Sequence, residues 1–410
     1  MAMASWRPAA ALVTFVVLSV ACTRSATETT STVDTTPQQT STAGPAAVDR
    51  ILVIDEGAVV TMDRDGASRR TIADAGDVIP FQPTWAPDGV RVAYSEVSLD
   101  GPAVVMTSDD GEEPQRFATD SNVFYMYWSP DGSRLTSLRE SAAGGLQLDI
   151  LDVEANDVRT IDGGQPLYYS WSPDSDRLAT HIGVDRLELL DPAGGSVELG
   201  SRPGAFPSPQ WTPLGIFHLS VLAVNQALTL TDPDGEPRIL ATVPGPSIFT
   251  AARSGARVAV QSLVDEGAGI DAAYLQDAPL LAAGRLVVID VATGEHVEAG
   301  ANPVAAFFWS PGGDRLLSLT GDGRSIHWEV WDDGGSTAFP DIVPSPTFIR
   351  DYLAFFDQYA QSSSLWAPDG SAFVFPGSVD GVDGIWRQDA RPDAEPVRIS
   401  SGTWAVWSPV

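Results

Sequence analysis

Lysine is absent from this 410-residue sequence, and all 24 basic residues are arginines set against 54 Asp and Glu. The formal net charge is −30 and the isoelectric point is about 4.2. A surface this acidic repels the phosphates of nucleic acids and of anionic lipids, so nucleic-acid binding is excluded from the expected functions. Two explanations of the acidity stay open: solubility combined with a codon usage that avoids lysine, or an acidic face that binds a partner.

Cysteine and histidine are scarce. The single cysteine, Cys22, excludes an intramolecular disulfide. The four histidines lie far apart in the sequence, show no i, i+4 pairing and have no neighbouring cysteine: His181, His218, His296 and His327. A transition-metal site needs several such ligands within reach of one ion. We therefore expect no metal and no cofactor.

Long hydrophobic runs are also missing, and the N-terminus carries only a short one. Arg7 precedes an uncharged stretch, residues 9–21, that is too short to span a bilayer stably. We interpret residues 1–21 as an export signal. Cys22 follows directly and resembles the lipidated cysteine of bacterial lipoproteins, although those signals usually carry Leu three residues earlier, where this chain has Ser19. An ordinary peptidase site after Ala21 is the alternative.

Residues 22–49 then form a segment rich in Thr, Ser, Ala, Pro and Gln, without an apolar period. Such a composition cannot bury enough surface to offset the entropy of ordering, so we expect a disordered tether. A flexible chain of about 25 residues has a root-mean-square reach of roughly 28 Å. The sequence therefore predicts an exported protein that is anchored by lipid to the outer face of the cell membrane.

What the sequence has in abundance is a repeat. An aromatic run, a Pro-Asp-Gly turn and a new apolar segment follow one another, as in Tyr127-Trp128-Ser129-Pro130-Asp131-Gly132. Copies of different quality are marked by these residues: Trp85, Trp128, Trp171, Trp211, Ala252, Trp309, Trp366 and Trp407. The markers are spaced by 43, 43, 40, 41, 57, 57 and 41 residues, which indicates a period of about 42 with two insertions.

Each repeat unit reads as four short strands joined by tight turns, with a longer link to the next unit. This pattern predicts an all-β propeller of four-stranded antiparallel blades over residues 50–410. Seven complete units are followed by a lone strand before Trp407, and three strands precede Trp85. Joining the two ends makes an eighth blade and closes the ring. Seven blades is the alternative, because the units at Trp211 and Ala252 are degenerate.

The units resemble the propeller repeat of TolB-type proteins, which also occurs in tricorn and prolyl oligopeptidase-like peptidases. The resemblance implies a propeller and no activity, because the motif is a blade turn. Trp is expected to fill the wedge between blades, and Asp to accept bonds from nearby backbone N–H groups. We assign structural roles to these residues and their equivalents in other units: Trp85, Asp88, Arg91, Trp128, Asp131, Arg134, Trp171, Asp174, Arg177, Trp309, Trp366 and Trp407.

No catalytic constellation stands out. The three residues before each marker contain no carboxylate, His or Arg, which argues against acid–base chemistry in the central channel. A Gly-x-Ser-x-Gly elbow is absent, and no length remains for a hydrolase domain. Catalytic residues are therefore not assigned.

The two insertions, residues 265–284 and 341–362, are expected on the propeller face opposite the Pro-Asp-Gly turns. In the second, a helix starting near Ser345-Pro346 is predicted to carry one aromatic stripe: Phe348, Tyr352, Phe355, Phe356 and Tyr359. The polar positions off this stripe are expected to stay available to a partner or ligand: Arg350, Asp351, Asp357 and Gln358. The helix packs onto the propeller in one interpretation and forms a lid in the other.

The leading functional hypothesis is a monomeric, membrane-tethered scaffold that binds a protein or another cell-envelope component. The alternative is a small-ligand sensor, or a hydrolase- or lyase-type enzyme, with its site on the face that carries the insertions.

Overall fold

The computed structural model describes residues 49–410, except 77, 201, 205–206, 223–224, 234–235, 244, 263–282 and 322–324. The predictions for the signal, Cys22, the tether and nearly all of the first insertion thus lie outside the described residues.

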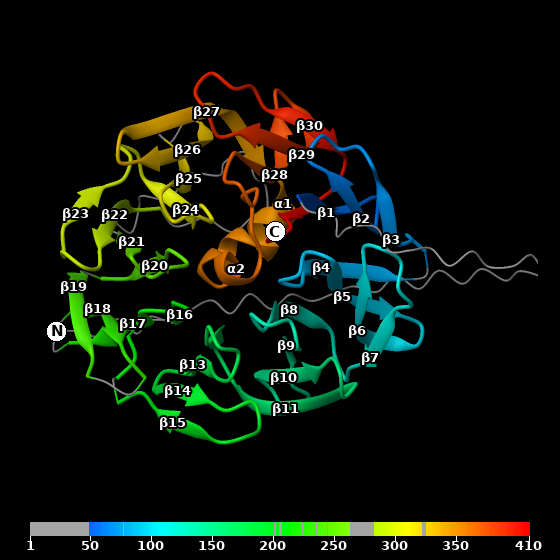
Figure 1. Ribbon diagram of the computed structural model, residues 1–410, viewed down its shortest axis with the longest axis horizontal. Coiled ribbons are helices and arrows are strands. Elements are labelled where there is room, and N and C mark those ends of the chain that lie inside the picture. The colour runs from blue at the N-terminus through cyan, green and yellow to red at the C-terminus, as the bar shows by residue number, and fades with distance from the viewer. Residues whose placement is uncertain are drawn as a thin grey trace, which may run out of the picture. The chain divides into compact units, whose positions relative to one another are not determined.

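The chain folds as a β-propeller in which successive antiparallel sheets surround a central axis (Figure 1). Five sheets follow the chain in order with four strands each. Two of them are formed by β4 (Ile79–Trp85), β5 (Arg91–Ser98), β6 (Gly101–Ser108) and β7 (Gln115–Ala118), and by β8 (Val123–Trp128), β9 (Arg134–Glu140), β10 (Leu146–Asp152) and β11 (Asp157–Gly164).

The next three sheets repeat this order. They are formed by β12 (Leu167–Trp171), β13 (Leu178–Ile182), β14 (Arg186–Leu190) and β15 (Ser196–Glu198), by β16 (Gln210–Thr212), β17 (Gly215–Val221), β18 (Gln226–Thr231) and β19 (Arg238–Val243), and by β20 (Ser247–Ala251), β21 (Arg257–Ser262), β22 (Arg285–Asp290) and β23 (His296–Glu298). The expected four-stranded antiparallel units are therefore confirmed.

A longer sheet contains two repeat units. Its strands are β24 (Val304–Trp309), β25 (Leu316–Gly321), β26 (Ile326–Asp332), β27 (Gly335–Pro344), β28 (Ala372–Val379), β29 (Val382–Asp389) and β30 (Val397–Ser400). The extended β27 joins the two units, since Val343 pairs with Ser378 and Pro344 with Gly377. Eight separate sheets are thus not formed in the described residues, and the count of eight blades stays a prediction.

The two ends of the described chain share one sheet, as expected. β1 (Arg50–Asp55), β2 (Ala58–Asp63) and β3 (Arg70–Ala73) are completed by β31 (Trp404–Trp407), which pairs with β1. The Asp49 amide donates to the Val410 carbonyl at 3.1 Å beside this pairing. β31 therefore pairs with the edge of β1 that would otherwise stay open.

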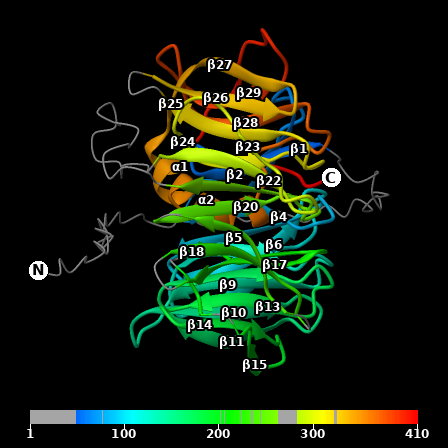
Figure 2. The ribbon, with the colours of Figure 1, turned by 90° about the vertical axis from the view of Figure 1, so that its left-hand side faces the viewer.

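The antiparallel order defines two faces. Inner strands such as β8 end at the Trp-x-Pro-Asp-Gly turns, on what we call the turn face; the opposite side, which carries the second insertion, is the insertion face. Figure 2 shows the short helices α1 and α2 on one side and the C-terminus on the other. Within the described part of the chain, no helix is long and apolar enough to cross a membrane.

The repeat motif joins neighbouring units. The guanidinium of Arg91 lies 5.2 Å from the ring centre of Trp128 in the next unit, and Arg315 lies 5.3 Å from Trp366. Within its own turn, Asp88 accepts hydrogen bonds from the amides of Val90 and Arg91. The arginines thus contact the tryptophan of the next unit, and the aspartate binds amides of its own turn.

One marker is displaced from its expected place. The turn that follows β20 has the same backbone bonds as the others, with Ala252 N donating to Arg257 O and Gly255 N donating to Ala252 O. This register makes Ala251, and not Ala252, the equivalent of the repeat tryptophan. The marker at Ala252 was wrong by one residue, because the unit lacks the aromatic ring by which the others align.

Candidate functional site

The second insertion closes the centre of the propeller at the insertion face. It folds as α1 (Pro346–Asp351), the 3-10 turn η1 (Leu353–Phe355) and α2 (Phe356–Ser362), which we call the plug. Figure 1 shows α2 at the centre of the ring, and α2 contacts β8, β12, β20 and β24. Ser345 caps α1 by accepting a hydrogen bond from the Phe348 amide, as its position predicts.

The plug is not the single helix that we expected. The backbone breaks at Tyr352, where φ is −129°, and again at Phe355, where φ is −133°. Phe348, Tyr352 and Tyr359 are buried, but Phe355 is 49% exposed. The prediction of one continuous aromatic stripe was therefore wrong, because the chain turns to fit the channel instead of following the helical period.

Aromatic rings hold the plug in place. Phe356 meets Phe307 edge to face with ring centres 4.9 Å apart. Tyr359 meets Tyr125 in the same way at 4.8 Å. Such pairs add about 0.5 to 1.5 kcal/mol each beyond the burial of their area. The packing interpretation of the second insertion is the one that the structure supports.

Gln358 is buried, which corrects its expected availability to a partner. Its side-chain amide donates to the Tyr169 carbonyl at 2.8 Å and accepts from the Tyr169 amide at 3.0 Å. It also donates to the Tyr125 hydroxyl and accepts from the Ser208 hydroxyl. Gln358 therefore replaces a missing strand partner for the inner strands of the propeller.

Asp357 is buried as well, so the prediction that it stays exposed was also wrong. Its carboxylate accepts a hydrogen bond of 2.7 Å from the Ser208 amide. Burial raises the pKa of Asp357 to about 6, although the Ser208 amide acts in the opposite direction. Asp357 and Gln358 point inward because the break at Phe355 rotates α2 relative to α1.

Arg350 and Asp351 remain on the surface of the insertion face. The Arg350 guanidinium bonds both carboxylate oxygens of Asp351 at 2.7 Å. Their role in binding a partner stays a prediction.

A cavity of about 370 Å³ opens at the turn face, on the other side of the plug. The end of α2 and the residues after it, from Ala360 to Leu365, contribute to its lining. The ring around it is formed by the markers and by prolines of the repeat turns: Trp85, Trp128, Trp171, Trp211, Ala251, Trp309, Trp366, Trp407, Pro87, Pro130, Pro173, Pro213, Pro311, Pro368 and Pro409. Residues that we interpreted as structural thus also build the wall of a pocket.

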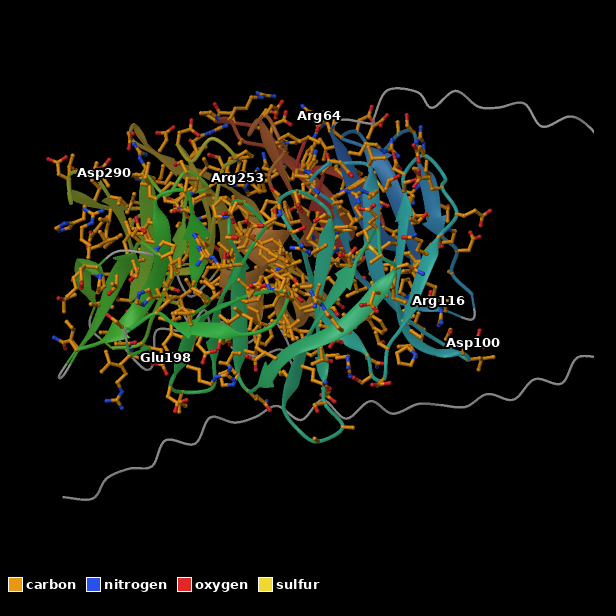
Figure 3. All side chains as sticks on the ribbon, turned by 60° about the horizontal axis from the view of Figure 1, so that its bottom comes forward. Arg64, Asp100, Arg116, Glu198, Arg253 and Asp290 are labelled. Carbon is orange, nitrogen blue, oxygen red and sulfur yellow. The ribbon has the colours of Figure 1, made fainter. Side chains whose placement is uncertain are left out.

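Among its described lining residues, the cavity has few ionisable groups. They are Tyr127, at the end of β8, and Arg253, in the turn after β20. Burial raises the pKa of Tyr127 to about 12, and the positive charge of Arg253 acts against this shift. Figure 3 shows Arg253 on the same side of the sheets as Arg64, which follows β2, and Asp290, which ends β22.

A metal centre has no support in the part of the chain that the structure describes. No three His, Cys, Asp or Glu side chains are grouped there to hold an ion. His218 is buried and its Nε2 lies 2.9 Å from the Thr231 hydroxyl. Burial lowers the pKa of His218 to about 4, which is the behaviour of a neutral core histidine.

Among the comparisons with known proteins, only solved structures are similar to this chain. The sequence matches no protein-family profile, and a search of curated proteins finds no match. An oligogalacturonate lyase in complex with manganese is similar at a TM-score of 0.51 with 14% identity, over 84% of this chain and 96% of that one. A eukaryotic initiation factor is similar at 0.55 with 10% identity, over 88% and 99%.

TolB from Acinetobacter baumannii is similar at a TM-score of 0.42 with 12% identity, over 80% of this chain and 68% of that one. At 14% and 10% identity, the likeness to the lyase and to the initiation factor shows the fold alone. The manganese of the lyase belongs to that protein.

Proposed function

We propose that this protein is an extracytoplasmic, membrane-tethered binding propeller whose ligand site is the cavity at the turn face. The observation that carries the proposal is the cavity itself: a concave, aromatic-lined space of about 370 Å³, with a few polar groups from the plug at its base. Pockets of this size and lining are typical of ligand sites. The sequence favoured the insertion face, but there the plug fills the channel.

Binding without turnover is favoured by the ionisable groups in the cavity. General acid–base catalysis needs a group that can exchange a proton near the working pH. Burial raises the pKa of the tyrosine in the described lining to about 12. The other ionisable residue of that lining is an arginine, a residue type that does not act as a proton donor in proteins. Turnover of a bound compound by the full-length protein would favour the enzyme alternative instead.

The binding site can be tested by filling it. Ala251→Trp places the repeat tryptophan where this unit lacks it, so the variant should fold normally while its cavity shrinks. Full-length wild type and variant are screened by thermal shift against metabolites, envelope fragments and peptides. A ligand at a hundred times its Kd stabilises the native state by about 2.7 kcal/mol, and we expect this gain in the wild type only. An equal gain in both proteins would place the ligand elsewhere.

The membrane tether rests on Cys22 and the segment that follows it. We expect Cys22→Ala to move the protein from the membrane fraction to the medium or periplasm, because one thioether-linked lipid anchor is lost. The measurement is the distribution of the protein between fractions, with mass spectrometry of the N-terminus. A wild-type protein that is already soluble and carries an unmodified Cys22 would contradict the anchor.

A further inference from the structure

The repeat unit that contains β20 departs from the motif at three positions of its turn. Where the unit at Trp128 has Trp, Pro and Asp, this unit has Ala251, Arg253 and Ser254. The first change removes a large ring, and the other two change the formal charge of these positions from −1 to +1. Two of the three, Ala251 and Arg253, line the cavity.

The missing ring leaves a recess in the aromatic wall. Five repeat tryptophans are at most 5% exposed: Trp85, Trp128, Trp171, Trp366 and Trp407. Trp211 and Trp309 are only partly buried. These two belong to β16 and β24, whose sheets flank β20 on its two sides. An alanine methyl cannot cover its neighbours as an indole does. Trp211 and Trp309 both line the cavity at this point, and the Arg177 guanidinium lies 5.5 Å from the centre of the Trp211 ring.

Arg253 brings an unbalanced positive charge to the same recess. Its side chain is exposed, and it forms no ion pair or hydrogen bond with any residue that the structure describes. In the unit of β4, the turn Asp88 instead binds its own Arg91 at 2.6 Å. The turns on either side of Arg253 carry Leu214 and Gly312 at the Asp position. The second of these turns has its carboxylate two residues later, at Asp314, which accepts a hydrogen bond from the Ser310 hydroxyl.

The charge of Arg253 also reaches into the cavity. It opposes the burial-driven rise in the pKa of Tyr127. Tyr127 lies on β8, and Figure 1 shows β8 and β20 on different sides of the centre. The positive charge of the Arg253 guanidinium therefore affects a residue on the opposite side of the cavity, and not only residues of its own turn.

We propose that the recess between Trp211 and Trp309 binds a small organic acid, with its carboxylate on Arg253 and the apolar face of its ring against the indoles. This inference rests on the proposed function and names the ligand class for the same cavity. A guanidinium binds carboxylates in a planar, two-point geometry, and exposed indole faces favour rings of an aromatic acid or of a sugar acid. In a chain of net charge −30, a site for an anion requires such a local exception.

Matched probes test the carboxylate. N-acetyltryptophan and N-acetyltryptophanamide have the same aromatic ring, but only the first carries a carboxylate. Glucuronate and glucose differ in the same way and have a sugar ring. Calorimetric titration of the full-length wild type should show the acid of one pair binding about tenfold or more tightly than its neutral partner. The pair that binds shows whether the ligand's ring is aromatic or a sugar.

The variants assign the effect to the recess. In Arg253→Gln, the acid and its neutral partner should bind with nearly equal affinity, so that the ratio of their affinities is close to one. The matched control Arg159→Gln makes the same charge change on the outermost strand β11 and should leave the ratio unchanged. Ala251→Trp should weaken both members of the pair, because it fills the recess.

Three results would overturn the inference: equal binding of acid and neutral probe, a ratio that survives Arg253→Gln, or no binding of either acid at millimolar concentration. A neutral ligand that binds the wild type and is lost in Ala251→Trp would leave the proposed function intact while removing the carboxylate anchor. If the thermal-shift screen finds no ligand that depends on the cavity, the proposed function itself fails.

Discussion

Deleting residues 403–410 is expected to abolish the native fold. The deletion removes β31 and with it the innermost strand of the sheet that β1 to β3 form. It also removes Trp404 and Trp407, which are 3% and 1% exposed, and loss of one such buried ring typically costs about 3 to 5 kcal/mol. Since native proteins are stable by only about 5 to 15 kcal/mol, the remaining chain should not fold cooperatively.

The control is a deletion of residues 23–47, which removes none of the described contacts. We expect its melting temperature to stay within a few degrees of the wild type. Circular dichroism and calorimetry of both deletions provide the measurement. Equal melting temperatures for the two would contradict closure by a shared sheet.

Gln358→Ala is expected to destabilise the protein on the order of 3 to 5 kcal/mol. The substitution leaves the buried amide and carbonyl of Tyr169 without partners, and each unsatisfied buried group costs about 1 to 3 kcal/mol. It also opens a void next to Tyr125, whose hydroxyl contacts the same side chain. Denaturant titration measures the change in the free energy of unfolding.

Arg350→Ala is the matched control from the same insertion. Its side chain is about half exposed and pairs with Asp351, so the change should stay within about 0.5 kcal/mol. Similar effects of the two substitutions would show that the plug does not hold the inner strands together.

The sequence was sufficient to predict the architecture because each repeat motif determines the structure of its own neighbouring residues. Each Pro-Asp-Gly turn determines its own hairpin, as Asp88 shows by binding the amides of Val90 and Arg91. The spacing of the markers then predicts four strands per unit, and the incomplete first and last units predict their pairing. Only the unit of β20 was misaligned, since Ala251 gives no aromatic signal.

The plug could not be predicted in the same way. Helical periodicity describes a straight helix on a flat surface, whereas α1, η1 and α2 fill a narrow channel. The break at Phe355 turns Asp357 and Gln358 toward β12 and the segment before β16. No pattern in residues 341–362 shows that Tyr169 and Ser208 need hydrogen-bond partners.

The sequence by itself determined which residues form strands, how the strands join into antiparallel units and which ends meet, because turns and strand periodicity act between near neighbours in the chain. Tertiary structure alone decided which mouth of the channel is closed, which polar side chains are buried and where a cavity remains. Those outcomes depend on the space that all the sheets leave at their common axis. The recess at Ala251 depends on both. The sequence shows that this unit lacks the repeat tryptophan, but the cavity beside Ala251 forms only because the fold places Trp211 and Trp309 on its two sides.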